Sequence, residues 1–175
     1  FIEVKALEVA MAIENGADEV DIVLNPGMVI SGHVDEAASE VELLREEARD
    51  VVLKVIIESG ALKSPELIRR ASLISMFAGA DFIKTSTGKI DVAATPEAAF
   101  IMCNAIKDYY NETGRKVGFK AAGGVKTPED AALYYTIVEE VLGKEWLTTD
   151  LFRIGASSAA NNLISAITDK PTKYF

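Results

Sequence analysis

The sequence contains a single cysteine, Cys103, and a single histidine, His33, among 175 residues. A single cysteine excludes a disulfide framework, so we expect a reducing compartment, the cytoplasm. A single histidine excludes a histidine-rich metal site and a Ser-His-Asp arrangement. A Cys-His pair is disfavoured, because Cys103 lies in mid-helix among positions typical of a core. We therefore expect no bound metal.

Long apolar runs and an excess of basic residues are also missing. The longest apolar runs, such as Val51–Ile57, are interrupted by lysine and are far shorter than the ~20 residues that span a bilayer. The formal net charge is −9, whereas nucleic acids and anionic membranes select basic surfaces. We therefore expect neither a membrane nor a nucleic acid as a partner, although small anions can still bind at local sites.

Apolar spacing and capping residues predict five helices. Apolar residues at three- and four-residue steps predict one helix over Phe1–Asn15 and another from Val34 to Leu44. Three more helix starts combine a hydroxyl N-cap, a proline at the first helical position and a glutamate in the first turn. These starts are Ser64-Pro65-Glu66, Thr95-Pro96-Glu97 and Thr127-Pro128-Glu129.

Five short β-rich runs alternate with these helices. They lie at Glu19–Leu24, Val51–Ile57, Asp81–Thr85, Val117–Ala121 and Leu151–Ile154. Their starts recur roughly every 30–36 residues, which is the period of a right-handed βα unit building a parallel sheet. After the first run, Asn25-Pro26-Gly27 is a turn signal. With 49% hydrophobic residues, the chain suits one α/β domain and is too short for two.

Charged residues interrupt four of the predicted strands: Asp21, Lys54, Lys84 and Lys120. In a (β/α)8 barrel, alternate strand residues face the interior and the carboxyl ends of the strands form the active site, so Asp21, Lys84 and Lys120 would converge there. A lysine held out of water is pushed toward its neutral, nucleophilic form, as a Schiff-base lysine requires. Two alternatives remain open: Lys84 extends to solvent from an edge strand, and Lys54 forms a buried ion pair with Asp21.

Glycine and hydroxyl residues follow three consecutive strands. Backbone N–H groups at such turns, and at a helix start, can bind phosphate. We therefore predict a phosphate site at these strand ends, the alternative being that each glycine only makes a turn. The residues are Gly88, Lys89, Gly123, Gly124, Gly155, Ser157 and Ser158.

Five ordered motifs resemble the deoxyribose-phosphate aldolase family: Val20–Val23, Leu53–Glu58, Phe82–Lys89, Gly118–Val125 and Arg153–Ser158. The resemblance implies a TIM (β/α)8 barrel. About five βα units are present, so we expect residues 1–175 to be one N-terminally truncated barrel domain. It also implies a lyase that needs no cofactor and reversibly cleaves a phosphorylated sugar, 2-deoxy-D-ribose 5-phosphate, to acetaldehyde and D-glyceraldehyde 3-phosphate.

The resemblance also assigns roles by position. Lys84 matches the Schiff-base lysine, Lys120 the second lysine that favours its free amine, and Asp21 the aspartate that helps to relay protons. The seven residues named above, Lys89 included, match the phosphate-binding surroundings, and Tyr174 lies where relatives can carry a terminal tyrosine. The alternative hypotheses for the function are a different phosphate-binding barrel lyase or isomerase, or an inactive phosphate-binding fragment. A homo-oligomer is compatible with the sequence.

Overall fold

The computed structural model describes residues 1–157 and 159–174, in which strands and helices alternate. The strands are β1 (Glu19–Val23), β2 (Val52–Ile56), β3 (Phe82–Lys84), β4 (Gly118–Ala122) and β5 (Phe152–Gly155). The helices are α1 (Ile2–Glu14), α2 (Pro26–Ser31), α3 (Val34–Ala48), α4 (Ser59–Leu62), α5 (Pro65–Phe77), α6 (Pro96–Thr113), α7 (Pro128–Leu142) and α8 (Ala159–Thr168), with a 3-10 turn η1 (Lys144–Trp146). No helix in this described part is long and apolar enough to cross a membrane.

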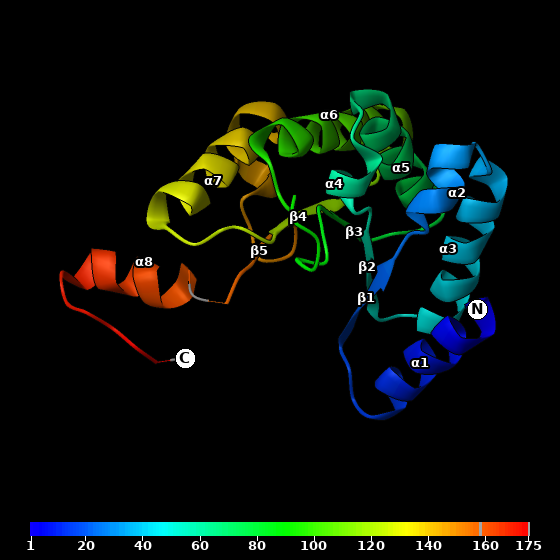
Figure 1. The fold of residues 1–175 in the computed structure, drawn as a ribbon, viewed down its shortest axis with the longest axis horizontal. Helices are drawn as coiled ribbons and strands as arrows, with labels where there is room; N and C mark the ends of the chain where they lie inside the picture. The colour runs from blue at the N-terminus through cyan, green and yellow to red at the C-terminus, as the bar shows by residue number, and fades with distance from the viewer. Residues whose placement is uncertain (158, 175) are drawn as a thin grey trace.

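The five strands form one sheet in chain order, and every neighbouring pair is parallel. In Figure 1, helices α1 to α7 form an arc around one side of the strands, while the opposite side is open. Helix α8 extends beyond β5, away from this arc. The predicted α/β class with a parallel sheet is therefore confirmed, with five βα units in the described chain.

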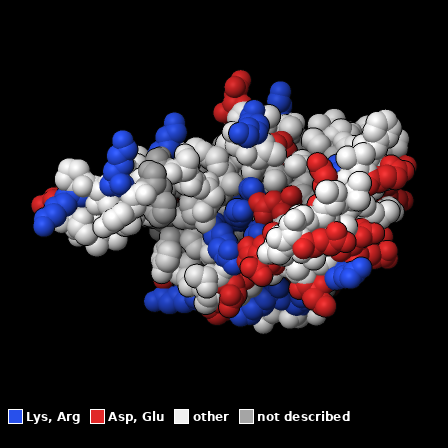
Figure 2. Space-filling view, turned by 90° about the horizontal axis from the view of Figure 1, so that it is seen from below, with Lys and Arg blue, Asp and Glu red and all other residues white. Residues whose placement is uncertain are grey.

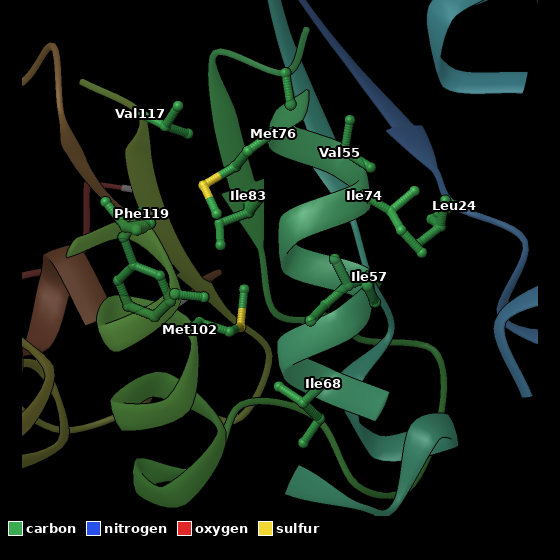
Figure 3. Packing of buried hydrophobic residues seen from close by; sticks show 14 of the residues in the cluster. Leu24, Val55, Ile57, Ile68, Ile74, Met76, Ile83, Met102, Val117 and Phe119 are labelled. Carbon is green, nitrogen blue, oxygen red and sulfur yellow. The ribbon is translucent and has the colours of Figure 1, made fainter. Parts of the chain in front are cut away.

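The helix-facing side of the sheet is the core. One row of apolar residues crosses all five strands in register: Ile22, Val55, Ile83, Phe119 and Phe152. Its first four members are buried and belong to one cluster with side chains of α5 and α6, which Figure 3 shows around Ile83 and Phe119. Since parallel strands covered by helices need apolar residues on that face, this row holds the layers together.

The open side of the sheet carries the charged residues. Side chains alternate along each strand, so Lys84, Lys120 and Arg153, which are neighbours in the register, share this face. Glu19 on β1 accepts hydrogen bonds from Arg153 on β5, with Nη2–Oε1 at 2.9 Å and Nη1–Oε2 at 3.2 Å. Because β1 and β5 are the two edges of the sheet, this contact requires a sheet curved around its charged face.

The predicted helix starts are confirmed by their caps. The hydroxyls of Ser64, Thr95 and Thr127 accept backbone hydrogen bonds at 3.1–3.2 Å in the first turns of α5, α6 and α7. The prediction of a turn at Asn25-Pro26-Gly27 is wrong, because these residues begin α2. The Asn25 side chain accepts from the N–H groups of Gly27 and Met28, which makes it an N-cap with proline at the first helical position.

Strand boundaries differ from the prediction by at most one residue at either end. The runs starting at Val117 and Leu151 each shift by one position, because Ala122 and Gly155 pair in the β4–β5 ladder although neither favours strands. Apolar periodicity marks the residues that are buried, while the ladder ends where the backbones diverge. The short helix α4 and the turn η1 gave no periodic signal and were not predicted.

Gly118 is expected to be required by the packing of Phe82, its register partner on β3. A Cβ atom at Gly118 would lie 2.3 Å from the Phe82 ring. Gly118→Ala should lower the free energy of unfolding by about 1–3 kcal/mol, the usual cost of overpacking. Urea unfolding measures this, and Phe82→Leu should make room for the added methyl. The double variant should therefore lose less stability than the sum of the single variants; strict additivity would contradict the steric explanation.

Candidate active site

Asp21 on β1 is surrounded by three lysines from the next three strands, and we call these four residues the lysine cluster. Asp21 Oδ2 accepts from Lys84 Nζ at 2.6 Å and from Lys120 Nζ at 2.8 Å, and its Oδ1 accepts from Lys54 Nζ at 3.0 Å. The register explains the convergence, because Asp21 is opposite Lys54 and Lys84 is opposite Lys120. One carboxylate therefore holds three ammonium groups on the same face of the sheet.

The three lysines differ in their access to solvent. The Lys54 side chain is 5% exposed, while those of Lys84 and Lys120 are 13% and 17% exposed. Lys54 also pairs with Glu19 at 2.7 Å, so its interpretation as a buried ion-pair partner of Asp21 is confirmed. The alternative of an edge-strand position for Lys84 is wrong, because β3 is the central strand.

Positive charge exceeds negative charge on this face. Figure 2 looks at the molecule from its open side and shows Lys and Arg side chains gathered near the middle, next to carboxylates. Four cationic side chains meet two carboxylates: Lys54, Lys84, Lys120 and Arg153 with Glu19 and Asp21. When all four cationic groups are protonated, they exceed the carboxylates by two charges, which favours an anionic ligand here although the protein as a whole is acidic.

The cluster changes the ionisation of its members. Burial works against the charged form of Asp21, but hydrogen bonds from Lys120, Lys84 and Lys54 outweigh it and hold the pKa of Asp21 well below its usual range. Burial lowers the pKa of Lys120, and the positive charges of Lys84 and Lys54 lower it further against the attraction of Asp21. The Asp21 carboxylate is thus shared by all three lysines.

A cavity of about 470 Å³ opens beside Lys84 and Lys120 at the carboxyl ends of β3, β4 and β5. Six of the seven residues predicted to bind phosphate line it: Gly88, Lys89, Gly123, Gly124, Gly155 and Ser157. The seventh, Ser158, lies outside the described residues. Thr87 and Lys126 also line the cavity and were not among the predicted site residues. Thr87 could have been found from its place between Ser86 and Gly88.

The turn after β3 is fixed against the turn after β4. Gly123 has φ +83°, and a Cβ atom there would lie 2.5 Å from Ala93 and 2.8 Å from Ser86 Oγ, so only glycine fits. Ser86 Oγ donates to the Ala122 carbonyl at 2.6 Å and accepts from Gly88 N–H at 3.2 Å. These contacts set the width of the cavity between the two glycine turns.

The remaining candidates lie elsewhere. Cys103 is buried in α6, where burial raises the pKa of its thiol, and His33 is an exposed residue before α3. Tyr174 is 75% exposed, and its N–H donates to Asn161 on α8. Within residues 1–157 and 159–174, no group of three or more His, Cys, Asp or Glu side chains could hold a metal ion.

Comparison with known families matches residues 2–158 to the DeoC/LacD family aldolases. The chain belongs to this family. It is 46% identical over 156 residues to the deoxyribose-phosphate aldolase of Mus musculus and 42% identical over 156 residues to that of Homo sapiens. Each match covers 89% of this chain and 49% of the relative, so the chain spans about half the length of these curated relatives.

Solved structures extend the family assignment to the fold. A crystal structure of a proposed deoxyribose-phosphate aldolase from Toxoplasma gondii superposes with a TM-score of 0.80 at 24% identity, covering 95% of this chain and 65% of the other. An aldolase named QR15 superposes with a TM-score of 0.75 at 28% identity, covering 96% and 69%. The five βα units are therefore part of the (β/α)8 barrel that this aldolase family uses, as the sequence predicted.

Asp21 is expected to make folding sensitive to acid. Its pKa is lower in the folded state than the unfolded value of about 3.9, so its contribution to stability is present above that pH and is lost as the pH falls toward the folded pKa. Asp21→Asn leaves the lysines without their carboxylate and should cost on the order of 3 kcal/mol near neutral pH. The variant should also show a smaller loss of stability below about pH 4, measured by urea unfolding at several pH values.

The exposed Asp150 provides a matched control. Asp150→Asn removes the same charge without touching the lysine cluster, so it should keep the acid dependence of the parent. If Asp21→Asn and Asp150→Asn gave the same pH dependence as the parent, the ion pairs of Asp21 would not control acid stability.

Proposed function

We propose that this chain carries the reacting groups of a deoxyribose-phosphate aldolase, a lyase that uses a Schiff base in place of a metal. The substrate would be 2-deoxy-D-ribose 5-phosphate and the products acetaldehyde and D-glyceraldehyde 3-phosphate, in a reversible reaction. The observation that carries the proposal is that the ammonium groups of Lys84 and Lys120 both contact Asp21 Oδ2, beside a glycine-lined cavity. Membership of the aldolase family and the names of the mouse and human relatives support it.

The lysine cluster suits the formation of an imine. Two ammonium groups that share one carboxylate oxygen repel each other, so the loss of one proton leaves the other as the only ammonium on Asp21 Oδ2. In our proposal Lys84 is the lysine that reacts as the amine, because it matches the Schiff-base lysine of the family by position. Burial lowers the pKa of Lys120, and its 2.8 Å contact with Asp21 opposes the loss of its proton. Lys84 Nζ then adds to the C1 aldehyde of the open-chain sugar, and loss of water gives a protonated imine.

Cleavage follows from the electron demand of the imine. A base, proposed to be water held by Asp21 and Lys120, takes the proton of the C3 hydroxyl. The C3 oxygen becomes a carbonyl as the C2–C3 bond breaks, and the bonding electrons pass into the imine to form an enamine on Lys84. D-glyceraldehyde 3-phosphate leaves, the enamine takes a proton at C2, and hydrolysis of the imine releases acetaldehyde and restores the amine.

The cavity between the glycine turns is proposed to hold the phosphate. Its lining includes Lys89 and Lys126 in addition to Lys84 and Lys120, so cationic side chains surround a space suited to a dianion. Phosphate contacts lie away from the bond that breaks, and they orient the reacting end of the sugar over Lys84. A cytoplasmic location and self-association, both considered from the sequence, stay predictions.

Lys84 should be the residue that forms the imine. Treatment of the natural full-length protein with acetaldehyde and borohydride should add an ethyl group to Lys84, located by peptide mass spectrometry. Lys84→Met should abolish the label, while Lys120→Arg, which keeps a positive charge beside Asp21, should leave labelling at Lys84 detectable.

Two outcomes would contradict this assignment. A label on Lys120 would move the imine to the neighbouring lysine, and a label that survives Lys84→Met would remove it from the lysine cluster. No label on the parent at all would favour another phosphate-binding barrel lyase or isomerase, or a phosphate-binding chain without turnover.

The phosphate should contribute through Lys89. Lys89→Met is expected to lower kcat/KM for 2-deoxyribose 5-phosphate about tenfold or more, the effect of losing one charge-assisted hydrogen bond. The same variant should leave kcat/KM for unphosphorylated 2-deoxyribose nearly unchanged. Lys116, an exposed lysine that lies over the Trp146 ring, gives the control Lys116→Met with the same change in net charge. Equal losses for both sugars would place the phosphate elsewhere.

A further inference from the structure

Glu58 is a buried carboxylate at the end of β2 that has no part in the chemistry described above. It is 7% exposed and has φ +52° and ψ +58°, a left-handed backbone conformation that residues other than glycine rarely adopt. Strained, buried residues of this kind persist where the surrounding structure holds them, and they cluster at functional sites. The contacts of Glu58 show what holds it.

Both carboxylate oxygens of Glu58 are used by one residue, Thr87. Oε1 accepts from Thr87 N–H at 3.1 Å, and Oε2 accepts from Thr87 Oγ1 at 2.6 Å. Thr87 Oγ1 accepts in turn from Lys89 N–H at 3.1 Å. A chain of hydrogen bonds therefore runs from Glu58 on one strand end, through Thr87, to the backbone of the lysine in the proposed phosphate site.

The backbone of this turn is satisfied from within the protein. The N–H groups of Thr87, Gly88 and Lys89 donate to the side chains of Glu58, Ser86 and Thr87, respectively. We had expected such N–H groups to bind phosphate directly, but here they serve to hold the turn. Lys89 is the cationic residue of this turn that lines the cavity, and the position of its backbone depends on how firmly the turn is held.

We propose that Glu58 is a positioning residue for phosphate recognition: it anchors Thr87 and so fixes the turn that presents Lys89 to the phosphate. The inference rests on the proposed function, because it names the device that holds the phosphate end of the same site. A carboxylate suits this role although the ligand is an anion, since both of its oxygens are turned to Thr87 and its charge is met by two donors.

The test compares two sugars and inorganic phosphate in the natural full-length protein. Glu58→Gln keeps the size of the side chain but loses one acceptor oxygen and the negative charge. We expect kcat/KM for 2-deoxyribose 5-phosphate to fall roughly tenfold to a hundredfold, the range for hydrogen bonds to charged groups, with little change for unphosphorylated 2-deoxyribose. Affinity for inorganic phosphate, measured by calorimetry, should weaken in the same direction.

Substitutions of Thr87 provide the matched pair. Thr87→Val removes the hydroxyl and should reproduce the effect of Glu58→Gln, whereas Thr87→Ser keeps the hydroxyl and should stay close to the parent. In a Lys89→Met background, Glu58→Gln should cause little further loss of kcat/KM, because both changes remove the same contact.

Lys63 has a similar left-handed backbone at the end of α4 but is exposed. Lys63→Gly therefore tests relief of local strain alone and should not alter the preference between the sugars.

The outcomes separate the two proposals. Trapping of acetaldehyde on Lys84 reports the proposed function and should persist in Glu58→Gln. If trapping succeeds but Glu58→Gln and Thr87→Val keep the parent's preference for the phosphorylated sugar, the role of Glu58 is overturned while the aldolase stands. Equal losses for both sugars would also overturn it, because they would show a general structural role. If acetaldehyde does not label Lys84 in the parent protein, the affinity for inorganic phosphate decides. Weaker phosphate binding in Glu58→Gln and Thr87→Val supports the positioning role of Glu58, and unchanged binding overturns that role.

Discussion

The carboxylate of Asp21, shared by three lysines, is the interaction on which the rest of the site depends. Ammonium groups that are 5–17% exposed are costly to remove from water. Asp21 lies 2.6–3.0 Å from all three, and Glu19 also pairs with Lys54, an arrangement that requires the four strands to keep their register. The parallel pairing of β1 to β4 sets that register, and the Glu19–Arg153 contact extends it to β5. Charge on this face thus constrains the curvature of the whole sheet.

The two faces of the sheet divide the tasks of stability and chemistry. The apolar row from Ile22 to Phe152 faces the helices, and its packing does not depend on ionisation. The adjacent positions on the same strands, among them Lys84 and Lys120, face the open side. Because the side-chain period of a strand is two, a slip of one residue would exchange the two faces, so the apolar core also secures the placement of the charges.

The sequence predicted the parts of this arrangement that depend on local pattern. Lys84 and Lys120 lie in β-rich runs in which side chains alternate between the two faces, so the face they share could be predicted. The caps at Ser64 and Thr127 were predicted from short motifs. The contacts that join distant segments could not be read in the same way. The pairing of Glu58 with Thr87 links residues 29 positions apart, and no sequence signal marks the left-handed backbone of Glu58, which directly follows the predicted strand Val51–Ile57.

The stretch from Lys84 to Lys89 is where the two halves of the proposed chemistry meet. Lys84 lies at its beginning, beside Asp21, and Lys89 lies at its end, at the glycine-lined cavity. Both neighbouring strands hold this stretch, since Glu58 binds it from the β2 side and the Ala122 carbonyl accepts from Ser86 on the β4 side. A single segment fixed at these two points can set the separation between the proposed imine on Lys84 and the proposed phosphate at Lys89.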